Sequence, residues 1–209
     1  MGGMDSTSLR TYGGVAGEDR QAGRRTQLLE AGLRLLGAPE GPHELTVRGV
    51  CREAGLAARY FYENFADRDV LAMAVYDRVA EDIAATTLEA VRAAPPDARA
   101  KTRAGLANLV RKVAEDPRRG RLLFSPALSA TVLAAKRAES TRWFVRLLGP
   151  QAREFSGLAE GSRRDLIAEL LVGGLAQALT SWLDGTLDVD EAGLVDLCTD
   201  VFLKVATPG

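Results

Sequence analysis

The chain has 209 residues, of which 46% are hydrophobic and 26% charged, and its formal net charge is −1. This length suits one large domain or a small domain joined to a medium one. The charge balance counts against a non-specific polyanion binder, which usually carries a basic excess. It leaves room for a site-specific nucleic-acid binder, in which only the docking face needs to be basic.

The first twenty residues are polar and rich in glycine, and they lack the apolar centre of a signal peptide. Residues 1–19 are therefore predicted to form a disordered tail. We find no apolar run of the length that a membrane span needs, so we expect a cytoplasmic protein with no membrane partner. The two cysteines, Cys51 and Cys198, are far apart and have no ligand-like spacing. This favours buried reduced thiols, since a disulfide would need an oxidising compartment.

Helical periodicity runs through the chain and strand signals are nearly absent, which predicts an all-α fold of about nine helices. A first helix is expected from about Arg20 to Gly37, where a Pro/Gly-rich break ends it. Thr46 is placed to cap a short helix, and Gly55 to form the turn before a second short helix that reaches about Asn64. Further helices are predicted over about 68–93, 97–115, 118–124, 127–154, 162–185 and 189–205, the first of them capped by Asp67.

Four aromatic residues lie within six positions, at Tyr60, Phe61, Tyr62 and Phe65, although only 6% of the chain is aromatic. At helical spacing, Phe61 and Phe65 fall near one face, where they can fill a small core. Arg59 and the two tyrosines then point mainly to solvent. The phenylalanines are expected to hold the segment down while the polar groups are presented outward.

Two short helices joined around Gly55 are typical of a helix-turn-helix, whose second helix can enter the DNA major groove. Arg59 can reach a guanine edge or a phosphate, and Thr46 lies at a helix N-terminus, which favours a phosphate. Residues 20–68 hold eight arginines and six acids, a net charge of +2. On this pattern alone, a compact three-helix module with solvated arginines stays open as the alternative.

The segment LTVRGVCREAGLAARYFYENFADRDVL, residues 45–71, resembles the DNA-binding region of TetR-type transcriptional regulators. The upstream segment RTQLLEAGLRLLGAPEG is similar to the first helix of that family. The match covers roughly residues 24–72. The residues that carry it are Thr46, Ala54-Gly55-Leu56, Phe61-Tyr62, Asn64-Phe65, Arg68-Asp69 and Leu71.

The resemblance implies a helix-turn-helix DNA-binding domain over residues 20–67 and a ligand-binding and dimerisation domain over residues 68–209. It also implies a ligand-responsive repressor that binds a near-palindromic operator as a homodimer, with half-sites about one helical turn apart. A small-molecule inducer would weaken DNA binding by favouring a state that cannot span both half-sites.

The resemblance also assigns residues on the DNA side. Thr46, Tyr62, Asn64 and Arg68 match phosphate-contacting positions. The positions that face the bases or their surroundings are Arg48, Ala57, Ala58, Arg59 and Tyr60. The family often has serine where Ala57 stands, so the second helix lacks a side-chain cap, at a cost of about 1 kcal/mol.

Apolar stripes on the last two helices match the dimer interface of the family, although they can also close the subunit's own core. The interface residues predicted from them are Leu170, Gly174, Ala178, Trp182, Leu194, Leu197, Val201 and Phe202. An inducer pocket is expected among the helices that follow residue 68, with a hydrophobic or aromatic ligand. Its predicted lining is Tyr76, Phe124, Trp143, Leu147 and Leu175, although residues of this kind are more often plain core than ligand contacts.

An enzyme is not expected. The only histidine, His43, lies in the Pro/Gly-rich break without an evident partner, and no catalytic, cofactor-binding or metal-binding motif appears. No cofactor is predicted. The remaining alternative is a helical small-molecule-binding protein whose DNA-binding module has degenerated. Ala57 and Ala58 favour it, and the retained Arg48, Arg59, Tyr62 and Arg68 oppose it.

Overall fold

The computed structural model describes residues 12–40, 42–125, 128, 132–139 and 162–206. Within these ranges the regular structure is helical and contains no strand, which confirms the all-α class. Residues 133–139 are helical, and residues 140–154 of the predicted helix over 127–154 lie outside the described residues. The main helices are α1 (Tyr12–Leu36), α2 (Val47–Ala54), α3 (Ala58–Tyr62), α4 (Arg68–Ala93), α5 (Ala98–Glu115), α6 (Pro117–Phe124), α8 (Ser162–Leu183) and α9 (Glu191–Ala206).

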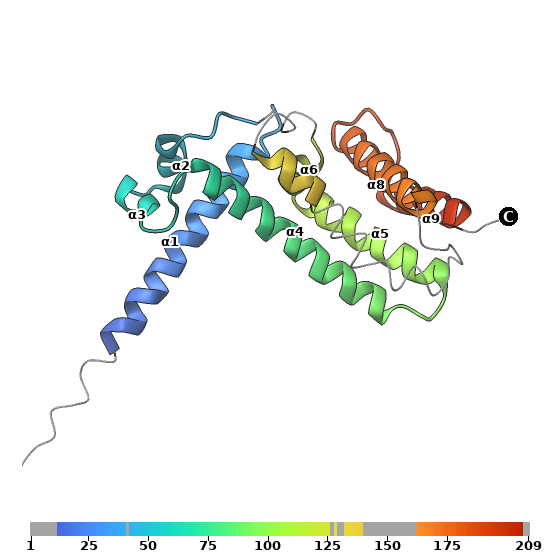
Figure 1. Cartoon of the computed structure of the whole chain (residues 1–209), viewed down its shortest axis with the longest axis horizontal. Helices are drawn as coiled ribbons and strands as arrows, with labels where there is room; N and C mark the ends of the chain where they lie inside the picture. Colours follow the sequence, from blue (N-terminus) through green and yellow to red (C-terminus); the bar gives the residue numbers. More distant parts are fainter. Residues whose placement is uncertain (1–11, 41, 126–127, 129–131, 140–161, 207–209) are drawn as a thin grey trace, which may run out of the picture.

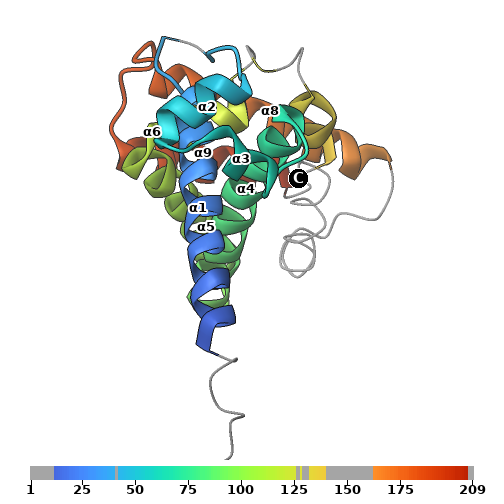
Figure 2. The ribbon, with the colours of Figure 1, turned by 90° about the vertical axis from the view of Figure 1, so that its left-hand side faces the viewer.

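The first helix is longer than predicted. α1 begins at Tyr12, so the disordered tail expected over residues 1–19 is wrong for residues 12–19. Each glycine in this stretch costs about 1 kcal/mol of helix stability, but extending an existing helix needs no new nucleus. Figure 2 shows the first turns of α1 projecting beyond the other helices.

Local capping fixes the ends of the short helices as the sequence predicts. The Thr46 side chain accepts a hydrogen bond from the Gly49 amide at 3.0 Å. Gly55 ends α2 in the left-handed region, with φ of 66°, where a side chain would be strained. Asp67 accepts from the amides of Asp69 and Val70 at 2.9 and 2.8 Å and starts α4. α3 is a five-residue helix that ends at Tyr62, slightly short of the predicted end.

One hydrophobic core joins α1, α2, α3, α4 and α6. Phe61 and Phe65 are 0% and 2% exposed and lie in the same buried cluster as Leu71 and Leu122. The cluster continues along α4 through Val75 and Val79, on the far side of the boundary predicted at residue 67. The helices on the two sides of that boundary therefore share a core.

α6 packs closely against α1 and α8, and at two glycines there is almost no room for a side chain. A Cβ atom added at Gly37, just after α1, would lie 2.5 Å from the Arg118 carbonyl oxygen. A Cβ atom at Gly120 would lie 2.5 Å from a methyl carbon of Leu183 in α8. Figure 1 shows α6 between α1 on one side and α8 on the other. α6 therefore connects N-terminal helices to C-terminal ones, in addition to the packing of α4 on α5.

Charged side chains support the same junction. Arg118 donates to Glu30 of α1 and to Asp116, each at 2.8 Å. Burial would raise the pKa of Asp116, but the hydrogen bonds and charge of Arg118 outweigh it and hold that pKa below its usual value. Asp116 therefore stays ionised near neutral pH, and its oxygen also accepts from the Arg118 amide at the start of α6.

A second core lies among α5, α8 and α9, at the end of the molecule opposite α2 and α3 (Figure 1). Its buried members are Leu106, Val110, Leu179, Leu194 and Val195. Two ion pairs at its edge, Arg99–Asp200 at 2.7 Å and Arg103–Asp196 at 2.8 Å, fix α9 against α5.

We predict that Gly37→Ala destabilises the protein, because the new methyl group cannot fit against the Arg118 backbone without moving α6. Overpacking of this kind costs about 1–3 kcal/mol. Chemical denaturation followed by circular dichroism measures the change. Gly23→Ala is the matched control, since its Cβ meets nothing within 4 Å and alanine favours a helix. Equal stability of the two variants would show that α1 and α6 are not closely packed at this point.

Candidate nucleic-acid interface

The rings of Phe61 and Phe65 hold α3 in place from inside the module. Their centroids lie 5.9 Å apart, and both side chains are buried against α1, α2 and α4. The predicted division of the aromatic residues is therefore confirmed for the phenylalanines. Tyr62 contacts the edge of Phe61 with its ring and is 62% exposed.

Polar and small side chains from α2 and α3 cover the outer side of this module. Arg48, Ala57, Ala58 and Arg59 are exposed, and Thr46 is half-buried at the start of α2. We call Thr46, Arg48, Ala57, Ala58, Arg59 and Tyr62 the docking face. No side chain caps α3 at Ala57, as the sequence predicts. The docking face lies at the free end of the molecule, away from α8 and α9 (Figure 1).

Tyr60 is less open than predicted. Its ring is half-buried between the guanidinium groups of Arg24 and Arg59, which lie 4.2 and 4.5 Å from the ring centroid. Arg59 also donates a hydrogen bond to the Tyr60 hydroxyl. The expectation that Tyr60 points mainly to solvent is therefore wrong, because a long side chain from α1 covers it through a cation–π contact.

Asn64 and Arg68 both have partners within the protein. The Asn64 amide donates to the Tyr60 carbonyl at 2.8 Å, at the end of α3. Arg68 donates to the Leu45 carbonyl at 3.2 Å and lies 3.5 Å from Glu44. A phosphate at Arg68 would have to compete with this carboxylate, while the side chain keeps half of its exposure.

Sequence reasoning missed the role of α1 in orienting α3. Arg25 donates to the Asn64 carbonyl at 3.1 Å, and its guanidinium lies 4.4 Å from the Phe65 ring centroid. Arg24 pairs with Glu63 at 3.2 Å. The signal available in the sequence was the spacing of Gln21, Arg24 and Arg25. Side chains three or four residues apart share one face of a helix.

The predicted ligand pocket is not assembled by the described residues. Trp143 and Leu147 lie outside them. Tyr76 is 3% exposed within the first core, and Phe124 and Leu175 are partly buried against core residues. Two hollows formed by described residues have other linings. The inducer pocket therefore stays a prediction.

The predicted dimer residues divide into two groups. Leu194 is 2% exposed and belongs to the subunit's own core, so its assignment to an interface is wrong. Trp182 and Phe202 also pack on that core, and the Trp182 indole donates to the Val189 carbonyl at 2.8 Å. Ala178 is half-buried. The members that stay on the surface are Leu170, Gly174, Leu197 and Val201.

α8 is more apolar than the sequence reading allowed. The window Leu166–Leu183 has a mean hydropathy of 1.5, and 6% of it is buried. By length and composition this helix is able to cross a membrane, so the expectation that no segment has that property is wrong. One such helix is weak support for a membrane span. The same helix also packs against α6 and α9, with Leu179 fully buried.

The described residues include no group of three or more His, Cys, Asp or Glu side chains able to hold a metal ion. His43 does have a partner, Glu40, whose carboxylate lies 2.7 Å from the imidazole. This exposed pair lies in the connection between α1 and α2. Cys51 is buried and Cys198 half-buried, both as free thiols, and burial raises the pKa of each.

No family model matches the sequence, and no curated protein matches it either. Solved structures do match. A TetR family regulator from Marinobacter aquaeolei VT8 is 18% identical, with a TM-score of 0.69 over 90% of this chain and 97% of its own. The fatty acid degradation regulator FadR from Bacillus halodurans is 18% identical, with a TM-score of 0.72 over 85% of this chain and 97% of its own.

A third structure is the TetR family repressor AlkX from Dietzia sp. strain DQ12-45-1b, implicated in biodegradation of n-alkanes. It is 19% identical and has a TM-score of 0.53 over 87% of this chain and 94% of its own. These similarities extend over nearly the whole length of each protein. The chain therefore has the fold of the TetR family of transcription regulators.

Proposed function

We propose that the protein is a sequence-specific DNA-binding transcriptional regulator of the TetR family, which acts in the cytoplasm as a homodimer. The observation that carries the proposal is the docking face. Arg48, Arg59 and Tyr62 are exposed there on two short helices whose buried phenylalanines fix their position. Such an arrangement suits a site-specific reader in a chain without a basic excess.

The dimensions and chemistry of the docking face fit a major groove. An α-helix such as α3 is about 10–12 Å in diameter with its side chains, and the groove is about 12 Å wide. Arg59 can donate two parallel hydrogen bonds to a guanine once it leaves Tyr60. Ala57 and Ala58 offer only methyl groups, which suits contact with a thymine methyl. The Thr46 and Tyr62 hydroxyls can donate to phosphates, which set the register of the protein on the duplex.

The apolar surface of α8 and α9 supports a homodimer. Leu166, Leu170, Leu197 and Val201 are 60%, 65%, 61% and 53% exposed in the single chain. Nothing lies within 4 Å of a Cβ added at Gly173 or Gly174, so another backbone can approach closely there. Large apolar patches on a protein surface typically mark an interface. A symmetric pair of such surfaces would place two docking faces on one operator.

We further propose repression relieved by an apolar inducer. FadR and AlkX, which share the fold, regulate fatty acid degradation and are implicated in n-alkane biodegradation, respectively. Each of these two proteins is less than 20% identical to this chain. Their similarity therefore supports a class of ligand and not one particular compound. Tyr76 in α4 belongs to the buried, mainly apolar core that such a ligand would have to enter.

A second candidate is a small-molecule-binding protein with a degenerate DNA-binding module. Three features favour it. α3 lacks a side-chain N-cap, Arg59 contacts Tyr60, and Arg68 lies beside Glu44. Selection of bound fragments from random double-stranded DNA, near physiological salt, separates the two candidates. A near-palindrome with half-sites about one turn apart supports the regulator, whereas fragments without a shared sequence support the degenerate module.

We predict that Arg59→Ala weakens binding to the selected operator by about 1–3 kcal/mol and blurs base preference at one position in each half-site. Tyr62→Phe keeps the ring against Phe61, so its smaller loss reports the hydroxyl contact alone. Fluorescence anisotropy with labelled operator measures both. The control is Arg92→Ala, at the other end of α4, which should bind like the parent. Unchanged affinity in both docking-face variants would show that α3 does not contact the DNA.

We predict that Leu170→Glu combined with Leu197→Glu converts a dimer into a monomer, because the buried carboxylates would be unpaired. Size-exclusion chromatography with light scattering measures the mass, which should fall from that of two chains to that of one, 22.4 kDa. Leu187→Glu is the matched control, since Leu187 is 41% exposed but lies in the turn after α8. A wild-type monomer, or a double variant that stays dimeric, would contradict this interface.

A further inference from the structure

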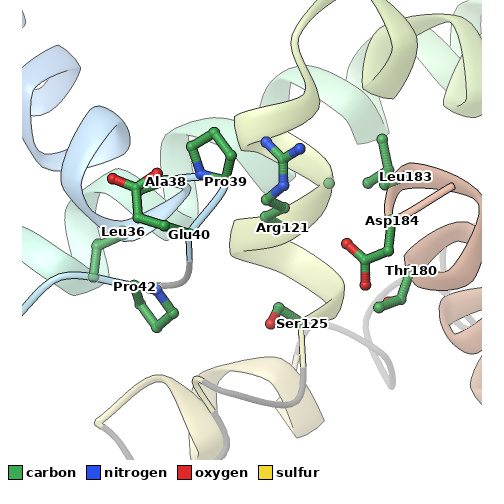
Figure 3. Close-up of a pocket in the computed structure, with 11 residues that line it drawn as sticks. Leu36, Ala38, Pro39, Glu40, Pro42, Arg121, Ser125, Thr180, Leu183 and Asp184 are labelled. Atoms are coloured by element: carbon green, nitrogen blue, oxygen red, sulfur yellow. The ribbon is translucent and has the colours of Figure 1, made fainter.

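A pocket of about 190 Å³ lies where three parts of the fold meet. The connection from α1 to α2 forms one wall, α6 the floor and the end of α8 the other wall. Figure 3 shows Arg121 standing on α6 between Pro39 on one side and Leu183 and Asp184 on the other. The full lining is Leu36, Ala38, Pro39, Glu40, Pro42, Gly120, Arg121, Ser125, Thr180, Leu183 and Asp184. None of these residues belongs to the docking face or to the predicted inducer pocket.

Arg121 differs from the other arginines of α6. Arg118 pairs with the carboxylates of Glu30 and Asp116. Arg119 pairs with those of Asp82 and Asp116. No hydrogen bond or ion pair to the Arg121 side chain is present among the described residues, and its Nε, like that of Arg119, is inaccessible to solvent without an acceptor. Buried donors in folded proteins almost always have an acceptor. A ligand carboxylate on the terminal nitrogens of the guanidinium would supply the ion pair that the protein does not.

The other groups of the pocket limit the ligand. Asp184 directs its carboxylate toward α6 (Figure 3), and Glu40 adds a second negative charge at the opposite wall. A simple anion would meet Arg121 but would be repelled by these carboxylates. A molecule with both a carboxylate and an ammonium group satisfies each sign of charge. Leu36, Pro39 and Leu183 offer apolar surface for the rest of a molecule, and the volume admits only a small one.

We propose that this pocket binds a small zwitterion of the α-amino acid class, with its carboxylate on Arg121 and its ammonium group on Asp184. The bound molecule would contact the α1–α2 connection, α6 and α8 together. It would therefore act as an effector at a site separate from the apolar inducer pocket. The binding step does not require the proposed DNA function, so each can fail without the other.

The test is thermal unfolding of the full chain with each common amino acid at millimolar concentration, followed by calorimetric titration of those that act. At a concentration a hundred times its Kd, a ligand should raise the Tm by about 5–10 °C for a protein of this size. Acetate and ethylammonium serve as probes with one charge each. We expect neither to match the best amino acid.

Arg121→Gln and Asp184→Asn should each weaken binding by about tenfold or more, since each removes a charge-assisted hydrogen bond. Arg92→Gln, a change of the same type on exposed surface, should bind like the parent. Circular dichroism checks that the variants fold. The proposal is overturned if no amino acid raises the Tm, if acetate acts as well as the best amino acid, or if a bound amino acid is insensitive to both pocket variants.

Discussion

The burial of Phe61 and Phe65 is the contact on which the rest of the N-terminal module depends. A five-residue helix such as α3 is far too short to be stable alone, since helix nucleation costs more than a single turn returns. Its position is therefore set by these two rings, and from outside by the arginines of α1 that contact Tyr60 and Phe65. The packing of this core therefore determines how firmly the docking face is held in position.

That core does not end with the module, and this has a mechanical consequence. It continues along α4 to Leu122 of α6, and α1 meets α6 at Gly37 with no room for a methyl group. Close-packed interiors respond to displacement by moving together, because there is little free volume to absorb it. In the proposed regulator, a shift of α6 must therefore move α1, and α1 carries Arg24 and Arg25, which contact the end of α3.

The features that sequence reasoning predicted correctly are local ones. The Thr46 and Asp67 caps, the Gly55 turn and the buried face of α3 follow from residues within a few positions of one another. The errors arose where distant segments decide the outcome. Tyr60 is covered by a side chain from α1, and Leu194 is buried by α5 and α8 rather than left for a partner. An apolar stripe shows that a face will be covered, but its sequence does not say by which surface.

The two proposed ligand sites differ in what a bound molecule would do. A molecule within the core around Tyr76 would act on packing, whereas a zwitterion on Arg121 and Asp184 would connect α6 to the end of α8 through charge. A ligand shifts a conformational equilibrium only by the ratio of its affinities for the two states. The walls of the Arg121 pocket belong to three segments that meet beside the Gly37–Arg118 contact. Arg121 lies on α6 and Asp184 directly follows α8, so any change in the placement of α6 against α8 alters the distance between the two charges. A ligand that needs both charges must therefore favour one placement.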